Sequence, residues 1–322
     1  MNKLYLLFTF CLIYTCVCSQ NTVEKIHFES ANPYSFNDVI TDLDNQEKQS
    51  VFGELVIPND TIDDGRKYPL VIGVAGSLGW GEHHYKYLKM YQEMGIATFE
   101  LNSFKSRGIT STVGTQNEIT MAAMILDAYR AFEALAEHPK IDKDRVSITG
   151  WSLGGGVTLF SAWLPLKEAI NKELSFASHL AYYPPCFINP DNTDFSKAPI
   201  HILIGELDNW TPSAPCLDLV DKLKPNTDIS LTIYKDSYHS FDRDAPLVRN
   251  ESAYNFSECV FRLDEKGNVL MNYFNIPMSN PFLQKLGFIT CVTRGVDFGG
   301  NTEARLKSFG FSKDFMKRTL FN

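Results

Sequence analysis

The sequence lacks a long run of basic residues, a second long apolar segment after its amino terminus, and any internal repeat. With 30 Lys and Arg against 38 Asp and Glu, the formal net charge is −8, so no nucleic-acid partner is expected. After the amino terminus no segment is apolar enough to cross a bilayer, so stable membrane insertion is not expected. The hydrophobic share of 44% excludes disordered, collagen-like and coiled-coil proteins.

Metal and nucleotide motifs are also missing. No H-E-x-x-H or C-x-x-C occurs, and His83 and His84 are neighbours in the chain instead of lying one helical turn apart. The glycine run at 154–156 fits neither G-x-G-x-x-G nor a P-loop. We therefore expect no metal and no cofactor.

The amino terminus has the layout of a secretory signal peptide, which we assign to residues 1–19. Lys3 precedes a 14-residue apolar stretch at 4–17, shorter than the roughly 20 residues of a membrane-spanning helix. A lipoprotein anchor at Cys18 is less favoured, because the preceding Val17 is bulky. Without a linker-like segment, residues 20–322 are predicted to form one domain, exported to the periplasm or secreted.

Seven cysteines become four once the signal peptide is removed. An even number in an exported protein indicates disulfides, and four buried free thiols are the alternative. Three pairings are possible, and the chain order favours local pairs between the first two and the last two of Cys186, Cys216, Cys259 and Cys291.

From residue 51, short β-branched runs alternate with helical patterns, as expected for an α/β fold with a mostly parallel sheet between helices. Strands are predicted at 51–57, 69–74, 96–101, 146–149, 178–183, 200–204 and 229–234, and helices at 84–94, 119–136, 302–321 and from 211–212 to 223. In the last of these, Thr211 supplies a capping hydroxyl before Pro212.

Residues 242–300 interrupt this alternation. Segments 260–263 and 268–271 flank a Gly-containing turn and predict a β-hairpin, which Cys259 and Cys291 bracket. The sequence therefore predicts a disulfide-bracketed C-terminal insertion beside the substrate cleft, ahead of the final helix.

The strongest chemical signal is G-x-S-x-G at 150–154, directly after a predicted strand and before a predicted helix. This pattern is typical of a nucleophile elbow, in which Ser152 occupies a sharp turn at the carboxyl end of the sheet. Side chains at Gly150 and Gly154 would collide with the neighbouring strand and helix.

A serine nucleophile needs a general base, and the base needs an orienting acid. Asp208 follows the predicted strand 200–204, and His239 follows the strand 229–234. The order Ser, Asp, His is the one expected on an α/β-hydrolase sheet. Glu206 is the main rival for the acid, followed by Asp236 and Asp242. A glycan on the Asn209 sequon would crowd this site, so Asn209 is predicted to be unmodified.

The developing oxyanion also needs hydrogen-bond donors. The backbone N–H of Leu153 is one candidate. The Gly-rich loop 75–81 offers Ser77 or Leu78 as the other, and the sequence does not separate them.

With these motifs in place, the chain from about residue 51 resembles the dienelactone hydrolase family of α/β-hydrolases. Besides G-W-S-L-G-G at 150–155, the resemblance lies in N-S-F-K-S-R-G at 102–108, Y-P-P-C at 183–186, D-N-W-T-P at 208–212 and Y-H-S-F-D at 238–242. It implies an eight-stranded, mostly parallel sheet and cofactor-free hydrolysis through an acyl-enzyme. Ser152 stands where the family's namesakes use cysteine, and Ala75-Gly76 stands where many α/β-hydrolases have His-Gly.

The sequence therefore predicts a serine hydrolase of carboxylic esters or lactones that acts on a small-molecule substrate. A peptidase or thioesterase on the same fold is the nearest alternative. A catalytically silent ligand-binding homologue is the alternative from another class.

Overall fold

A computed structural model describes residues 21–58 and 65–321. The predicted signal peptide lies outside the described residues. No helix among the described residues has the length and apolar character to span a membrane.

The core of the molecule is an eight-stranded sheet with the strand order β1-β2-β4-β3-β5-β6-β8-β9. Strand β2 is antiparallel to both of its neighbours, and the remaining pairs are parallel, as the family resemblance implies. The strands are β1 (Thr22–Ala31), β2 (Lys48–Ile57), β3 (Tyr68–Val74), β4 (Ala97–Leu101), β5 (Ile141–Trp151), β6 (Ser178–Tyr182), β8 (Ile200–Gly205) and β9 (Ile229–Tyr234).

All seven predicted strands are present, and β1 is an addition that the sequence analysis missed. It lies at the edge of the sheet and half of its residues are exposed, although Ile26 and Phe28 pack against the core and Ala31 at its end is buried. Such a short apolar alternation gives little strand signal.

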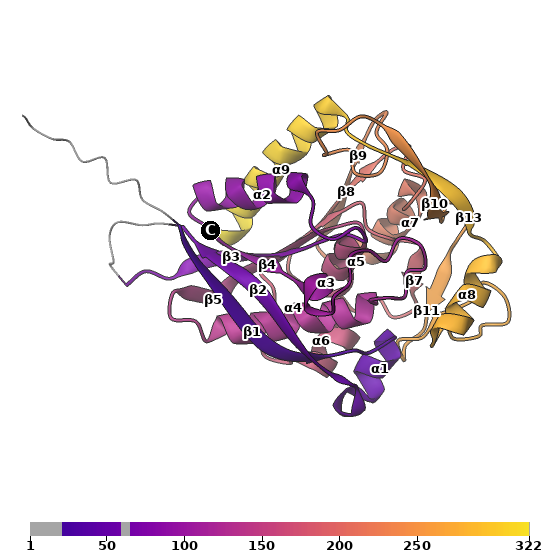
Figure 1. Cartoon of the computed structure of the whole chain (residues 1–322), viewed down its shortest axis with the longest axis horizontal. Coiled ribbons are helices and arrows are strands. Elements are labelled where there is room, and N and C mark those ends of the chain that lie inside the picture. Colours follow the sequence, from indigo (N-terminus) through magenta and orange to yellow (C-terminus); the bar gives the residue numbers. More distant parts are fainter. Residues whose placement is uncertain (1–20, 59–64, 322) are drawn as a thin grey trace, which may run out of the picture.

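Helices cover both faces of the sheet (Figure 1). Helices α2 (Glu82–Glu93) and α9 (Thr302–Leu320) pack together on one face, and α4 (Met121–Ala136) and α5 (Leu153–Phe160) pack together on the other. Four further helices are α1 (Phe36–Thr41), α3 (Ser103–Ser106), α6 (Leu164–Ile170) and α7 (Ser213–Leu223), with a 3-10 turn η1 (Leu43–Asn45).

The predicted helix 119–136 corresponds to α4. The hydroxyl of Thr120 accepts the N–H of Ala123 and caps its first turn. Met121, Ile125, Ala128, Phe132 and Leu135 recur at the three- to four-residue spacing of one buried helix face. The last four are fully buried, whereas Met121 is half-buried at the first turn.

A buried ion pair anchors the turn 102–108, one of the segments that carry the family resemblance. Arg107 donates two hydrogen bonds to the carboxylate of Asp127 in α4, at 2.7 and 3.1 Å. It also donates to the carbonyl of Ala31 and to Asn32, and Ser30 donates to Asp127. These bonds tie the end of β1 to α4.

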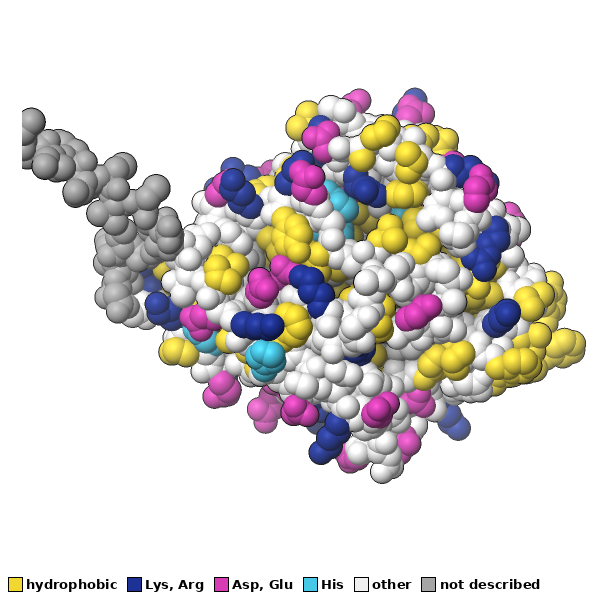
Figure 2. All heavy atoms as spheres, in the orientation of Figure 1, with side chains coloured by type: hydrophobic (Ala, Val, Ile, Leu, Met, Phe, Trp, Pro, Cys, Tyr) yellow, Lys and Arg dark blue, Asp and Glu magenta, His cyan; other side chains and the backbone are white. Residues whose placement is uncertain are grey.

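Residues 248–298 form the insertion, at one end of the molecule (Figure 1). Strands β10 (Val248–Asn255) and β13 (Thr293–Phe298) pair with each other, and helix α8 (Pro281–Ile289) lies between them in the chain. The predicted hairpin is present as β11 (Phe261–Leu263) and β12 (Val269–Leu270), and β11 also pairs in parallel with β7 (Ile188–Pro190). Apolar side chains gather on the outer surface over α8, among them the exposed Phe282 and Ile289 (Figure 2).

Both predicted disulfides are present. Cys186 is bonded to Cys216 and Cys259 to Cys291, with Cα atoms 4.9 and 5.2 Å apart. The second disulfide joins the start of the hairpin to the end of α8 and brackets most of the insertion. Two disulfides are typical of proteins in an oxidising, exported environment.

Candidate active site

Ser152 lies at the sharp turn between β5 and α5. Its backbone has φ 56° and ψ −115°, a conformation that is strained for a residue with a side chain. A Cβ on Gly150 would lie 2.2 Å from the carbonyl oxygen of Gly154, and one on Gly154 would lie 2.2 Å from that of Val74 in β3. Only glycine fits at these two positions, so the turn is the expected strand-turn-helix elbow.

The structure brings the three predicted residues into one hydrogen-bonded row. The Nε2 atom of His239 lies 2.9 Å from the Oγ atom of Ser152. On the other side of the ring, Nδ1 lies 2.7 Å from Oδ2 of Asp208. Ser152 is half-buried, whereas His239 and Asp208 are buried. Each residue follows the carboxyl end of a parallel strand (β5, β8 and β9), which is why positions 31 to 87 residues apart meet at one edge of the sheet.

The loop after β8 holds the Asp208 carboxylate from its other side. Its Oδ1 atom accepts the backbone N–H groups of Trp210 and Thr211 at 2.9 and 2.8 Å. The hydroxyl of Thr211 lies 3.0 Å from the carbonyl of Tyr183, 3.2 Å from Oδ2 of Asp208 and 3.1 Å from Nδ1 of His239. Asp208 is therefore fixed in orientation by its own loop.

The predicted capping role of Thr211 is wrong. Helix α7 begins one residue later, Pro212 is its N-cap, and no side chain caps it. The Thr211 hydroxyl is turned into the site, where it lies within hydrogen-bond distance of three polar atoms. The motif Thr-Pro predicts a helix start whether the threonine caps the helix or turns its hydroxyl into the site. The sequence alone therefore did not reveal the position of this hydroxyl.

The rival acids lie elsewhere. Glu206 accepts the backbone N–H of Asp236 through Oε2, and no hydrogen bond joins either residue to His239 among the described residues. Asp242 is buried and accepts the indole N–H of Trp151 at 3.1 Å and the hydroxyl of Tyr183 at 2.9 Å. Asp242 thus braces the elbow, a contact that the sequence analysis did not anticipate.

An aromatic stack supports the elbow beneath Ser152. Trp151 stacks with His84, at 4.4 Å between ring centroids, and with Tyr182, at 5.3 Å. Burial, with His83 and Arg243 nearby, holds the pKa of His84 well below its ordinary value. The Nδ1 atom of His84 accepts the N–H of Gly81. His84 therefore serves as a neutral aromatic support.

The predicted oxyanion donors all lie near Ser152. Leu153 is the first residue of α5, where a backbone N–H has no acceptor within its helix. Ser77 is buried in the turn after β3, whereas the side chain of Leu78 is half-exposed. The Ser77 carbonyl accepts the N–H of Thr112, which fixes the turn.

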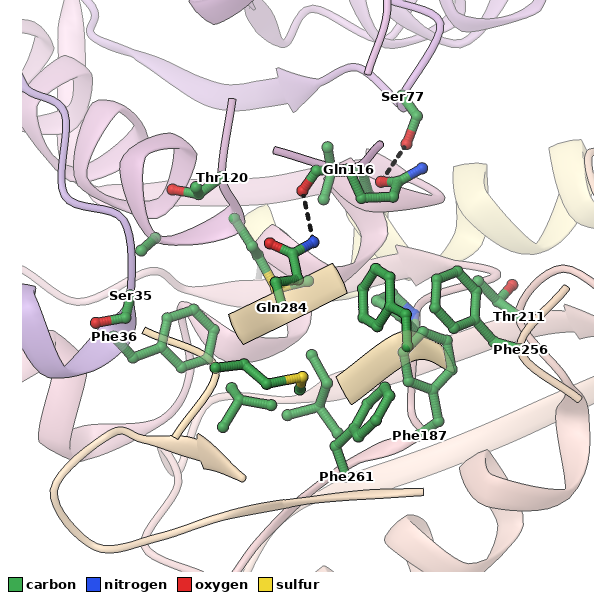
Figure 3. A pocket seen from close by; sticks show the side chains of 18 of the residues that line it. Ser35, Phe36, Ser77, Gln116, Thr120, Phe187, Thr211, Phe256, Phe261 and Gln284 are labelled. Carbon is green, nitrogen blue, oxygen red and sulfur yellow. Dashed lines mark hydrogen bonds between the residues drawn. The ribbon is translucent and has the colours of Figure 1, made fainter. Parts of the chain in front are cut away.

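Two cavities open at Ser152. The first, the insertion cavity, has a volume of about 160 Å³ and lies between the insertion, α1 and the start of α4. Figure 3 shows Phe187, Phe256 and Phe261 along one side of it. The second, the histidine cavity, has a volume of about 220 Å³ and is lined by His239, His83, His84 and Arg243. Ser77, Ser152 and Trp210 line both.

Metal-binding side chains do not gather at this site. Across residues 21–58 and 65–321, no group of three His, Cys, Asp or Glu side chains is close enough to hold a metal ion.

The fold and the elbow define an α/β-hydrolase. The model of the dienelactone hydrolase family matches residues 90–258, more than half of the sequence. The chain therefore belongs to the dienelactone hydrolase family, a family of hydrolases. None of the curated proteins compared with the sequence matches it significantly.

Solved structures share the fold at low sequence identity. One named m3DLH is 13% identical, with a TM-score of 0.58, and the match covers 93% of this chain and 99% of that one. The dienelactone hydrolase-like promiscuous phosphotriesterase P91 from metagenomic libraries is 12% identical, with a TM-score of 0.52 and coverages of 92% and 98%.

A larger neighbour matches over part of its length. It is a Bacteroides ovatus protein provisionally identified as a dipeptidyl aminopeptidase IV, 16% identical with a TM-score of 0.52. The match covers 69% of this chain and spans 33% of the Bacteroides chain. At such identities these likenesses concern the fold alone.

Proposed function

We propose that the protein hydrolyses carboxylic esters or lactones through an acyl-enzyme, with Ser152 as nucleophile, His239 as base and Asp208 as orienting acid. The observation that carries the proposal is the continuous hydrogen-bonded row of these three side chains at the mouth of two cavities. Membership of a hydrolase family supports it.

The reaction begins when Ser152 Oγ attacks the acyl carbon and His239 Nε2 takes the hydroxyl proton. The carbonyl oxygen becomes an oxyanion, which accepts hydrogen bonds from the backbone N–H groups of Leu153 and Ser77. Ser77 is preferred to Leu78 because it is buried and lines both cavities.

The bond between the acyl carbon and the alcohol oxygen then breaks, and His239 donates its proton to that oxygen. Water attacks the acyl-enzyme in the same way, so the acid is released and Ser152 regains its proton. In a lactone both products remain one molecule. Asp208 keeps the proton of neutral His239 on Nδ1 and stabilises the imidazolium that forms.

The direct test is Ser152→Ala. The variant is expected to lose hydrolysis of p-nitrophenyl acetate and labelling by a fluorophosphonate, whereas Ser257→Ala, at an exposed serine of the insertion, is expected to retain both. Unchanged turnover by Ser152→Ala in a clean preparation contradicts the assignment.

Peptide and thioester bonds are the nearest alternatives, because the same groups cleave them. A panel of short esters, thioesters and peptide amides, ranked by kcat/KM, separates these activities. A catalytically silent ligand-binding homologue predicts no stoichiometric labelling in active-site titration.

We also propose that residues 1–19 are a signal peptide, that residues 20–322 are a single exported hydrolase domain, and that the protein is periplasmic or secreted. The two disulfides support export. Intact mass and amino-terminal sequencing of the exported protein test the cleavage site. A chain that still carries residues 1–19, or a lipid on Cys18, contradicts it.

A further inference from the structure

The two cavities at Ser152 differ in their access to His239. The histidine cavity is lined by His239 itself, together with Tyr183 and Ser240. The lining of the insertion cavity includes Ser152, Leu153 and Ser77 but not His239. Ser77 and Ser152 line both cavities, so the difference lies in the proton donor His239, which lines only the histidine cavity, and in Leu153, which lines only the insertion cavity.

This difference determines which half of an ester each cavity can hold. When the tetrahedral intermediate collapses, the proton on His239 Nε2 has to reach the oxygen of the departing alcohol. The alcohol must therefore lie beside His239, and the acyl group must extend to the other side of Ser152. Building on the function proposed above, we infer that the histidine cavity takes the alcohol and the insertion cavity the acyl group.

The wall of the insertion cavity selects against charge. Aromatic rings supply much of it, and none of the described residues that line it is ionised at neutral pH. A carboxylate or ammonium group on the acyl chain would lose its water there without gaining a partner of opposite charge.

The polar groups on the facing wall are already occupied. Ser77 donates to the side-chain oxygen of Gln116, the backbone carbonyl of Gln116 accepts from the side chain of Gln284 (Figure 3), and Gln284 in turn accepts from the hydroxyl of Tyr34. This row joins the proposed oxyanion turn to α8 and to the segment before α1. It lets the cavity remain apolar without leaving these polar atoms unpaired.

The volume sets the size of the acyl group. A dry apolar cavity of about 150 Å³ holds one benzene molecule, and the insertion cavity measures about 160 Å³. The substrates are therefore esters or lactones of uncharged acids whose acyl group has about the bulk of a phenyl ring or a six-carbon chain.

The first experiment compares p-nitrophenyl esters of straight-chain acids with two to twelve carbons. Burial of each added methylene is expected to raise kcat/KM by about fourfold until the cavity is filled near six carbons. For longer chains kcat/KM is expected to fall again. The phenylacetyl ester is expected to match the best straight chain. An adipate monoester, with a terminal carboxylate, is expected to be at least about tenfold poorer than the hexanoate. A flat acyl series, or an adipate monoester hydrolysed as well as the hexanoate, overturns the inference.

The second experiment changes the wall. Val269 is a half-buried residue of β12 that lines the cavity, and Val260 is 53% exposed on the same hairpin. Val269→Trp is expected to lower the ratio of hexanoate to acetate kcat/KM by at least about tenfold, since the indole takes the space of two or more methylenes and each lost methylene is worth about fourfold. Val260→Trp is expected to keep the wild-type ratio.

Two further measurements keep the outcomes separate. Val269→Ala enlarges the cavity without inserting bulk and is expected to shift the optimum to a longer acyl chain, and stoichiometric fluorophosphonate labelling verifies that each variant is folded. Activity that survives in Ser152→Ala contradicts the proposed function. Ser152-dependent activity whose chain-length profile is the same in all three Val variants contradicts only the assignment of the acyl group.

Discussion

Replacing Asp208 by Asn tests whether activity depends on the tautomer of His239, because the variant keeps the histidine in place and changes which ring nitrogen carries the proton. In the wild type, Oδ1 of Asp208 accepts two backbone N–H groups, and Oδ2 faces Nδ1 of His239 at 2.7 Å. In the Asp208→Asn variant the amide oxygen has to remain at the Oδ1 position, because an NH₂ group there would face two donors. The NH₂ group then faces Nδ1, which becomes an acceptor, and the ring proton moves to Nε2. Ser152 then faces an N–H group instead of a base.

The structure gives the size of this effect. Recovering the productive tautomer requires the amide to flip, which leaves the N–H groups of Trp210 and Thr211 without their acceptor. At about 2 kcal/mol for each buried unsatisfied donor, the productive form lies about 4 kcal/mol higher. This energy corresponds to a loss of about a thousandfold in kcat/KM.

The assay is p-nitrophenyl butyrate hydrolysis at pH 7.5, with Glu206→Gln as the matched control. That control removes the charge of the rival acid, whose carboxylate accepts the backbone N–H of Asp236 in the loop after β9. It is expected to stay within about twofold, the range of a surface substitution. A loss below tenfold in Asp208→Asn, or a large loss in Glu206→Gln instead, refutes the assignment of the acid.

Three predictions concern stability. Arg107→Met leaves the carboxylate of Asp127 buried without its cation and is expected to cost about 3–5 kcal/mol in urea unfolding, whereas adding Asp127→Leu is expected to restore most of it. Replacing Cys259 and Cys291 by Ser opens a loop with a sequence separation of 32 and is expected to cost about 4 kcal/mol, seen as faster hydrogen exchange confined to residues 248–298. Burial lowers the pKa of His179 from 6.5 to about 4, so the part of the stability that this residue contributes is fully present above pH 6.5 and falls by about 3 kcal/mol as the pH approaches 4. Burial lowers the pKa of His201 to about 4 as well, so His179→Asn is expected to make the thermal-melting profile less steep without flattening it, and an unchanged slope contradicts the assignment.

Residues that meet because of the sheet topology were accessible to sequence analysis. Ser152, Asp208 and His239 each follow the carboxyl end of a parallel strand, and parallel strands place such positions at one edge. The local signal for each strand was strong; every residue of β8, for example, is buried. The elbow glycines were also predictable, because the G-x-S-x-G pattern that contains them spans five residues, even though the atom that a Cβ on Gly154 would meet belongs to β3.

Contacts between distant segments were not predictable in this way. The row Ser77, Gln116, Gln284 and Tyr34 joins four segments through side chains of unexceptional polarity. Met121 follows the core periodicity of α4 but is half-buried, because the insertion cavity opens at that position. Helical spacing identifies the inward face of a helix and does not distinguish packed core from the wall of a cavity.

The loop after β8 links the chemistry of the site to its specificity. Asn209 pairs with β13 of the insertion through both of its amide atoms, donating to Asp297 Oδ2 and accepting the Asp297 N–H, each at 2.9 Å. The next residue, Trp210, packs against His239 and Phe298 and lines both cavities. The backbone N–H of Trp210 also donates a hydrogen bond to Oδ1 of Asp208.

A change that loosens the insertion therefore reaches Asp208, the proposed orienting acid, within three residues of chain. We expect Asn209→Ala to lower kcat together with the preference for a six-carbon acyl group, whereas a substitution on the cavity wall such as Val269→Trp alters the preference alone. A glycan on Nδ2 of Asn209 would break the same bond to Asp297, which is the physical reason to expect this sequon to be unoccupied. An Asn209→Ala enzyme with wild-type kcat and chain-length profile would show that the insertion and the acid loop act independently.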